Sequence, residues 1–167
     1  MRQRAPAIHR AWGLPVAIAA LAALAVAVMG ATITEIGPWY HSLVQPRWAP
    51  PDAAYSVAWT VIYLCTALAA VIGWRAMPDA RGADWMIGLF ALNGFLNIVW
   101  SLLFFRLHRP DWAVVEVVAL WVSIAAWIYV VWPRSLGAGL LLLPYLGWVT
   151  FAGYLNMAIV RLNGPFG

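Results

Sequence analysis

The sequence predicts an all-α integral membrane protein that folds as a single bundle of five transmembrane helices. Of its 167 residues, 65% are hydrophobic and 10% are charged, and the mean hydropathy is +0.82. An ordinary soluble domain is excluded, because its hydrated surface needs about 25% charged residues. The apolar residues also fall in five continuous segments of about 20 to 25 residues, the length that a helix needs to cross a bilayer.

The breaks between these segments define the expected elements. We predict helices at residues 12–34, 55–74, 85–105, 112–132 and 136–160, with a long loop at residues 35–54, in one domain covering residues 1–167. A β-barrel is disfavoured because the apolar runs do not alternate with period two. The last three connections are short, so consecutive helices must run up and down through the membrane.

The first segment has two interpretations. Its basic start, its Ala-rich stretch and the small residues Gly30 and Ala31 are typical of a secretory signal peptide. The unbroken apolar stretch of about 17 residues is long for such a peptide, which favours a retained transmembrane helix. The alanines at positions 19, 23, 27 and 31 form a small-residue stripe that lets another helix approach closely.

The long loop is rich in proline and tryptophan and reads EIGPWYHSLVQPRWAPPDAA. One interpretation is an interfacial belt, because Trp and Tyr favour the level of the lipid headgroups. The other is an ordered lid, because long loops in compact domains are usually functional. The sequence leaves both open.

Charge placement predicts the orientation of the bundle. All ten basic residues are arginines, six of them on the side of the N-terminus and four on the opposite side. The positive-inside rule therefore predicts a cytoplasmic N-terminus and a long loop on the other side. These arginines are scattered among loops instead of forming a stripe, which argues against nucleic-acid binding.

Metal and disulfide chemistry find little support. Cys65 is the single cysteine, so no intramolecular disulfide can form, and we expect it to serve packing. His9, His41 and His108 have no partners at metal-ligand spacing, so we predict no metal site.

Four segments place polar and aromatic residues on one helical face. The sets are Tyr55, Trp59 and Tyr63; Asn93, Asn97, Trp100 and Phe104; Trp112, Glu116, Ser123 and Trp127; and Tyr145, Trp148, Ala152, Asn156 and Asn163. Each amide alone is best explained as packing between helices. Together the faces predict a cavity with aromatic walls and a few polar groups, suited to a flat, largely apolar ligand.

Glu116 allows a second pair of interpretations. It can serve as a proton-relay or ligand-orienting acid inside the membrane. The interpretation that the sequence favours is a helix-start carboxylate, stabilised by the helix dipole.

The motifs behind these faces are collinear from residue 30 to the end of the chain. They are Trp39-Tyr40-x-x-Leu43-x-x-Pro46-x-Trp48-x-Pro50-Pro51, Leu92-Asn93, Asn97-x-x-Trp100-x-x-x-Phe104-Phe105, Trp112-Ala113-x-x-Glu116, Pro144-Tyr145-Leu146-x-Trp148-x-x-Phe151-Ala152 and Leu155-Asn156-x-x-Ile159. This pattern resembles the tryptophan-rich sensory protein/translocator protein (TspO/MBR) family, whose mitochondrial members are called peripheral-type benzodiazepine receptors. Family members keep the first helix, so the resemblance implies that it is retained here.

The resemblance implies a five-helix bundle, commonly a homodimer in the bacterial cell membrane, whose intramembrane pocket is capped by the first loop. Such pockets bind protoporphyrin IX and other tetrapyrroles, as well as isoquinoline and benzodiazepine drugs. No bound cofactor is implied. Carried over by position, the ligand-binding residues are Tyr40, Trp48, Pro50, Trp59, Tyr63, Asn93, Asn97, Trp100, Phe104, Trp148 and Ala152.

Some bacterial relatives degrade bound porphyrin in light and oxygen, and the resemblance assigns Trp59 and Trp148 as the catalytic residues. An excited porphyrin can exchange an electron with an indole, whereas the sequence shows no acid–base pair or activated nucleophile. The cholesterol-recognition pattern of the family is incomplete here, because six residues separate Tyr154 from Arg161 and Met157 stands at the usual tyrosine position.

We therefore expect a membrane receptor or sensor that binds a porphyrin and modulates its level or transport. A light-dependent porphyrin-degrading enzyme is the first alternative and a small-molecule transporter the second. A transporter is less favoured because no inverted repeat is visible.

Overall fold

The computed structural model describes residues 13–34 and 36–166 and confirms the predicted fold class, because this part of the chain is all helical and contains no strand. The elements are α1 (Gly13–Ile33), α2 (Pro38–Ser42), α3 (Asp52–Ala76), α4 (Ala80–Ser101), the π-helix η1 (Leu102–Arg106), α5 (Pro110–Val131) and α6 (Leu136–Asn163). Four helices are long and apolar enough to cross a membrane, with α4 and η1 forming one span, and α1 adds the shorter apolar stretch Val16–Met29.

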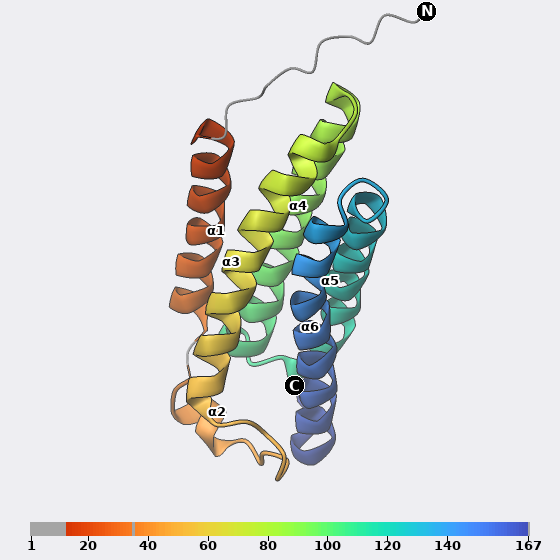
Figure 1. Cartoon of the computed structure of the whole chain (residues 1–167). Helices are drawn as coiled ribbons and strands as arrows, with labels where there is room; N and C mark the ends of the chain where they lie inside the picture. The colour runs from red at the N-terminus through yellow and green to blue at the C-terminus, as the bar shows by residue number, and fades with distance from the viewer. Residues whose placement is uncertain (1–12, 35, 167) are drawn as a thin grey trace, which may run out of the picture.

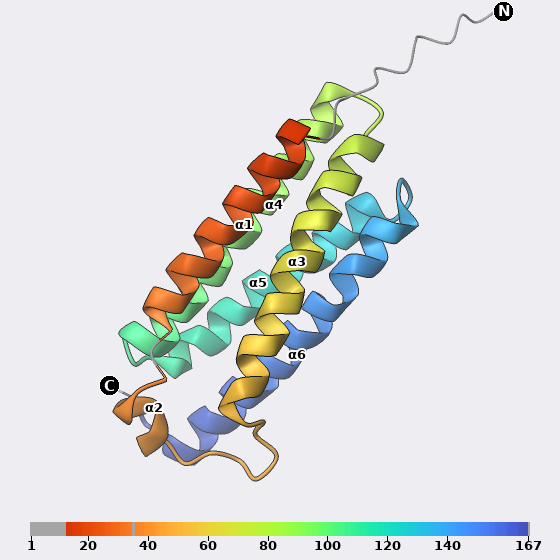
Figure 2. The same ribbon diagram turned by 60° about the vertical axis from the view of Figure 1, so that its left-hand side comes forward.

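The helices lie side by side and surround a common interior. Around the bundle, α1 contacts α3, α3 contacts α6, α6 contacts α5, α5 contacts α4, and α4 returns to α1. Figures 1 and 2 show α2 and its loop covering one end of this bundle, the end where α1 finishes and α3 begins. The N-terminal arginines, whose side is predicted to be cytoplasmic, lie outside the described residues.

Local chemistry sets where the helices begin. The Gly82 N–H donates to the Asp79 carboxylate at 2.7 Å, which caps α4. The helix therefore starts at Ala80, five residues before the predicted start at residue 85. At α5, Pro110 occupies the first turn, where the missing N–H costs no helical hydrogen bond. The last helix continues to Asn163, three residues beyond the predicted end.

The π-helix η1 is a feature that the sequence did not predict. It inserts a wider turn at Leu102–Arg106, where a continuous α-helix was expected. Within this turn, the neighbours Phe104 and Phe105 are both buried. The chain then turns at His108, whose φ of 52° is in the left-handed region and whose ring stacks on Trp39 at 4.1 Å.

At the end of the bundle away from the loop, α3, α4, α5 and α6 share a buried core. Met86, Trp127 and Val131 form a buried cluster there with residues of α3 and α6. Gly73 lets α3 approach this cluster, because a Cβ at this position would lie 2.6 Å from Met86 Cε and 2.8 Å from Val131 Cγ2. The absence of a side chain at Gly73 is therefore a packing requirement.

This requirement predicts that Gly73→Val destabilises the protein by about 2 kcal/mol or more, because the valine must displace a branched and buried neighbour. The measurement is thermal unfolding in detergent, followed by helical circular dichroism. Gly88→Val is the matched control, since no atom lies within 4 Å of its Cβ position. Equal melting temperatures for the two variants would contradict the packing role of Gly73.

Candidate functional site

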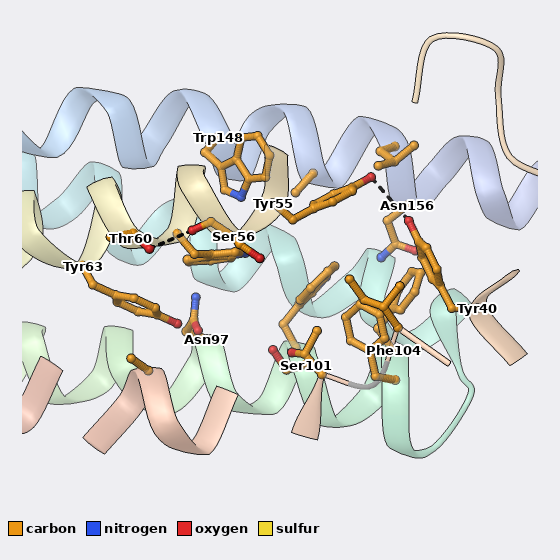
Figure 3. Close-up of a pocket in the computed structure, with 18 of the residues that line it drawn as sticks. Tyr40, Tyr55, Ser56, Thr60, Tyr63, Asn97, Ser101, Phe104, Trp148 and Asn156 are labelled. Atoms are coloured by element: carbon orange, nitrogen blue, oxygen red, sulfur yellow. Dashed lines mark hydrogen bonds between the residues drawn. The ribbon is translucent and has the colours of Figure 1, made fainter. Parts of the chain in front are cut away.

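A cavity of about 410 Å³ lies in the half of the bundle nearer the loop. Its walls come from α1, α2, α3, α6 and the junction of α4 with η1, while none of its described lining residues belongs to α5. This volume is within the range of about 300 to 1,000 Å³ that is usual for small-molecule pockets. Figure 3 shows side chains from these helices converging on the cavity.

Eight of the predicted site residues line this cavity. They are Tyr40, Trp59, Tyr63, Asn97, Trp100, Phe104, Trp148 and Ala152. The structure therefore brings together residues from the loop and from three of the predicted helix faces. Both candidate catalytic tryptophans, Trp59 and Trp148, are among them.

Flat aromatic surfaces form two parts of the wall. On α3, Trp59 stacks on Tyr63 with ring centroids 5.4 Å apart and planes 26° apart. On α4 and η1, Trp100 stacks on Phe104 at 5.3 Å and 25°. Both pairs are four residues apart, so one helical turn places each ring above the next.

Polar groups interrupt this aromatic wall at a few points. The Asn97 Nδ2 donates to the Tyr145 hydroxyl at 3.2 Å, which ties α4 to α6. Figure 3 shows Tyr63 and Asn97 directed toward the same part of the cavity. Thr60 donates to the Ser56 carbonyl at 2.8 Å, so its hydroxyl has a partner within α3.

Asn156 lines the cavity but is engaged by the backbone of α5. In the orientation that satisfies both sides of its amide, it donates to the Pro110 carbonyl at 3.0 Å and accepts from the Val114 N–H at 3.1 Å. These bonds connect the Asn156 side chain to backbone groups in the first turns of α5. The role of Asn156 is therefore to fix α5 against α6.

Three predicted ligand-binding residues lie outside the cavity lining. Asn93 is buried and donates to Ser123 Oγ at 3.0 Å, as the packing interpretation expects. Trp48 stacks on Tyr154 at 5.1 Å and meets Phe151 edge-on, so it attaches the loop to α6. Pro50 belongs to the same loop and does not reach the cavity lining.

The described part of the loop is ordered and attached at several points. The Val44 N–H donates to Asn163 Oδ1 at 2.7 Å, and Asn163 Nδ2 donates to the Val44 carbonyl at 3.0 Å. The Tyr40 hydroxyl donates to that of Tyr55 at 3.4 Å, and burial raises the pKa of Tyr40 above its ordinary value. These contacts favour the lid interpretation of the loop over a headgroup belt alone.

Other lining residues were not among the predicted ligand contacts. They include Tyr55, Ser56, Thr60, Ser101, Phe105, Leu155, Asn156 and Ile159. Tyr55 and Asn156 already lay on the predicted polar-aromatic helix faces, so helical spacing alone could have placed them in the cavity wall. Phe105 belonged to a quoted motif but not to the predicted helical face, because the π-helix sets its position.

The position of Glu116 argues against the helix-start interpretation. The helix begins at Pro110, and the acidic residue of its first turn is Asp111. The dipole effect falls off beyond the first turn. Asp111 instead pairs with Arg109 just before the helix, which leaves the role of Glu116 to be explained otherwise.

Comparison with known proteins decides the family. Residues 17–162 match the TspO/MBR family. The chain belongs to this family. It is 40% identical over 146 residues to the "Tryptophan-rich protein TspO" of Chlorobaculum tepidum, covering 84% of this chain and 90% of that protein.

Two further TspO/MBR relatives broaden the comparison. The chain is 32% identical over 125 residues to the "Tryptophan-rich sensory protein" of Cereibacter sphaeroides, covering 75% of this chain and 77% of that protein. It is 34% identical over 127 residues to the "Translocator protein" of Sus scrofa, covering 75% of each chain. The family and these names support a sensory or translocator role in a membrane.

The attachment of the loop gives a testable prediction. Asn163→Leu removes both hydrogen bonds to Val44, so the Val44 amide should exchange with solvent about ten- to a hundredfold faster, measured by hydrogen exchange in detergent micelles. Ser42→Ala is the control. The Ser42 hydroxyl donates to the Trp39 carbonyl within α2, so this bond does not attach the loop to another helix. Unchanged exchange in Asn163→Leu would show that the loop is held without this residue.

Proposed function

We propose that this TspO/MBR protein is a membrane receptor or sensor that binds a porphyrin in the cavity, with protoporphyrin IX as the type ligand, and thereby modulates its level or transport. The observation that carries the proposal is the pair of stacked aromatic surfaces, Trp59 on Tyr63 and Trp100 on Phe104, in one cavity. Flat π-surfaces favour offset stacking with a flat aromatic ligand.

The polar groups of the cavity support an oriented ligand. In an otherwise apolar wall, a small number of amide and hydroxyl groups fixes orientation and provides specificity. Asn97 and Ser101 supply such groups from α4, and Tyr63 supplies one from α3. The loop then covers the ligand, since Tyr40 reaches the cavity from α2.

The proposal includes the setting of the protein. We place it in a bacterial cell membrane with a cytoplasmic N-terminus, on the arginine distribution, and as a homodimer, on the family resemblance. The described helices are those of an integral membrane protein, which supports the membrane part directly.

A titration with protoporphyrin IX tests binding. We expect quenching of tryptophan fluorescence and a shift of the porphyrin absorption band when purified protein in detergent is titrated. Asn97→Ala should weaken the affinity about tenfold, because it removes a polar group of the wall and the bond to Tyr145.

Cys65→Ala is the control for this titration, since Cys65 lies on α3 outside the cavity lining. Equal affinities of the two variants would reduce Asn97 to a packing residue. An unquenched wild-type protein would refute porphyrin binding altogether.

The second candidate function is light-dependent porphyrin degradation, favoured by the presence of Trp59 and Trp148 in the wall of one cavity. An excited porphyrin can take one electron from an indole, which becomes a radical cation. Dioxygen can then accept that electron from the reduced porphyrin. Together these transfers oxidise one indole and reduce dioxygen to superoxide, which is the oxidant then available to attack the porphyrin ring. They need one oxidisable side chain beside the ligand and no acid–base pair.

Illumination distinguishes this candidate from binding alone. With oxygen present, wild-type protein should bleach bound porphyrin several-fold faster than a Trp59→Phe/Trp148→Phe variant, because phenylalanine is a far weaker electron donor. The measurement is loss of porphyrin absorbance under constant light, at ligand saturation for both proteins. Equal rates would dismiss the catalytic candidate and leave binding intact.

A further inference from the structure

Trp100 on α4 and Glu116 on α5 carry three buried polar atoms that have no hydrogen-bond partner among the described residues. They are Nε1 of Trp100 and both carboxylate oxygens of Glu116. Inside a bilayer, water does not compensate such groups, so each one needs a partner within the protein. Buried unsatisfied atoms of this kind call for a specific explanation.

The register of α4 and α5 places these two residues opposite each other. The helices are antiparallel neighbours, and the bond from Asn93 to Ser123 fixes their relative position at 3.0 Å. Trp100 lies seven residues after Asn93, and Glu116 lies seven residues before Ser123. Seven residues are close to two helical turns, so Trp100 lies on the same face of α4 as Asn93, and Glu116 on the same face of α5 as Ser123. Because the helices are antiparallel, these two steps run in the same direction and bring Trp100 and Glu116 to the same level of the bundle.

The packing around Trp100 agrees with this register. The indole packs against two core clusters, of which one contains Ala113 and the other contains Val117 and Leu120. These residues of α5 lie one turn before Glu116, next to it and one turn after it. Trp100 therefore packs against clusters that include residues of α5 on both sides of Glu116.

Trp100 also belongs to the cavity wall, whereas Glu116 does not. Its indole stacks on Phe104 and meets Phe105 edge-on at 6.0 Å and 80°. These rings fix the plane of the indole but provide no acceptor for its N–H. A hydrogen-bond acceptor on the side of the indole away from the cavity would also fix the direction of its N–H within that plane.

We propose that Glu116 is a positioning residue of the cavity: its carboxyl oxygen accepts a hydrogen bond from the Trp100 indole N–H across α4 and α5. The glutamate side chain has three rotatable bonds, and rotation about them brings the two facing groups into contact. The bond holds the indole at the angle at which it meets a ligand. This inference rests on the proposed ligand-binding function and adds a residue that acts from a helix outside the cavity.

The first test needs no ligand. In protein with ¹⁵N-labelled indoles, the Trp100 Nε1–H resonance is identified by its loss in Trp100→Phe. Glu116→Leu should shift this resonance, while Glu116→Gln, which keeps an acceptor oxygen, should shift it much less. Val118→Leu is the matched control on α5, because Val118 is exposed on the outer surface of the bundle.

A second measurement uses the wild-type protein and does not depend on any variant folding. The Trp127 Nε1 is also buried without a partner, and this side chain is fully buried. If the bond forms, the Trp100 indole proton should exchange with water more slowly than that of Trp127, although Trp100 borders an open cavity. Faster exchange at Trp100, or an unmoved resonance in Glu116→Leu, would overturn the proposal.

Affinity for protoporphyrin IX provides the functional test. Glu116→Leu and Trp100→Phe should each weaken binding about tenfold, and the double variant should be no weaker than Trp100→Phe alone, since both remove one bond. Losses that multiply in the double variant would refute the coupling. If wild-type protein binds no porphyrin, the proposed function fails, while the resonance and exchange measurements still decide whether the bond exists.

Discussion

The structure depends on one constraint, which is that polar groups inside a bilayer must find their partners within the protein. Asn93 meets this demand with Ser123, Asn97 with Tyr145, and Asn156 with the backbone at the start of α5. Each bond joins two different helices of the group α4, α5 and α6. The amides therefore fix the relative positions of these helices, and the aromatic wall is built on that fixed frame.

The two ends of the bundle then have different properties. At one end, Gly73 allows α3 to pack directly against Met86 and Val131. At the other end, bulky rings on α3 and α4 hold the helices apart and enclose the cavity. The loop over the cavity end is attached by a few specific contacts at Asn163, Tyr154 and His108.

Sequence spacing predicted most of the frame and much of the wall. Residues four apart had to stack, as Trp59 does on Tyr63, and apolar length defined the spanning helices. Spacing could not separate Asn93 from Asn97, since they share a face and differ only in what the neighbouring helices offer them. It also missed Phe105, which a π-turn buries, and the loop attachment at Asn163, which lies 119 residues from its partner Val44.

The helix α5 lines none of the described cavity, but it packs against two of the helices that do. Because α5 lies between α4 and α6, it receives Asn156 from one neighbour and Asn93 from the other. Glu116 is on the same helix, and the register set by Asn93 and Ser123 places it level with Trp100, whose indole forms part of the wall. A substitution on α5 can thus change the cavity without lining it, because the polar contacts of α5 support the helices that carry the wall.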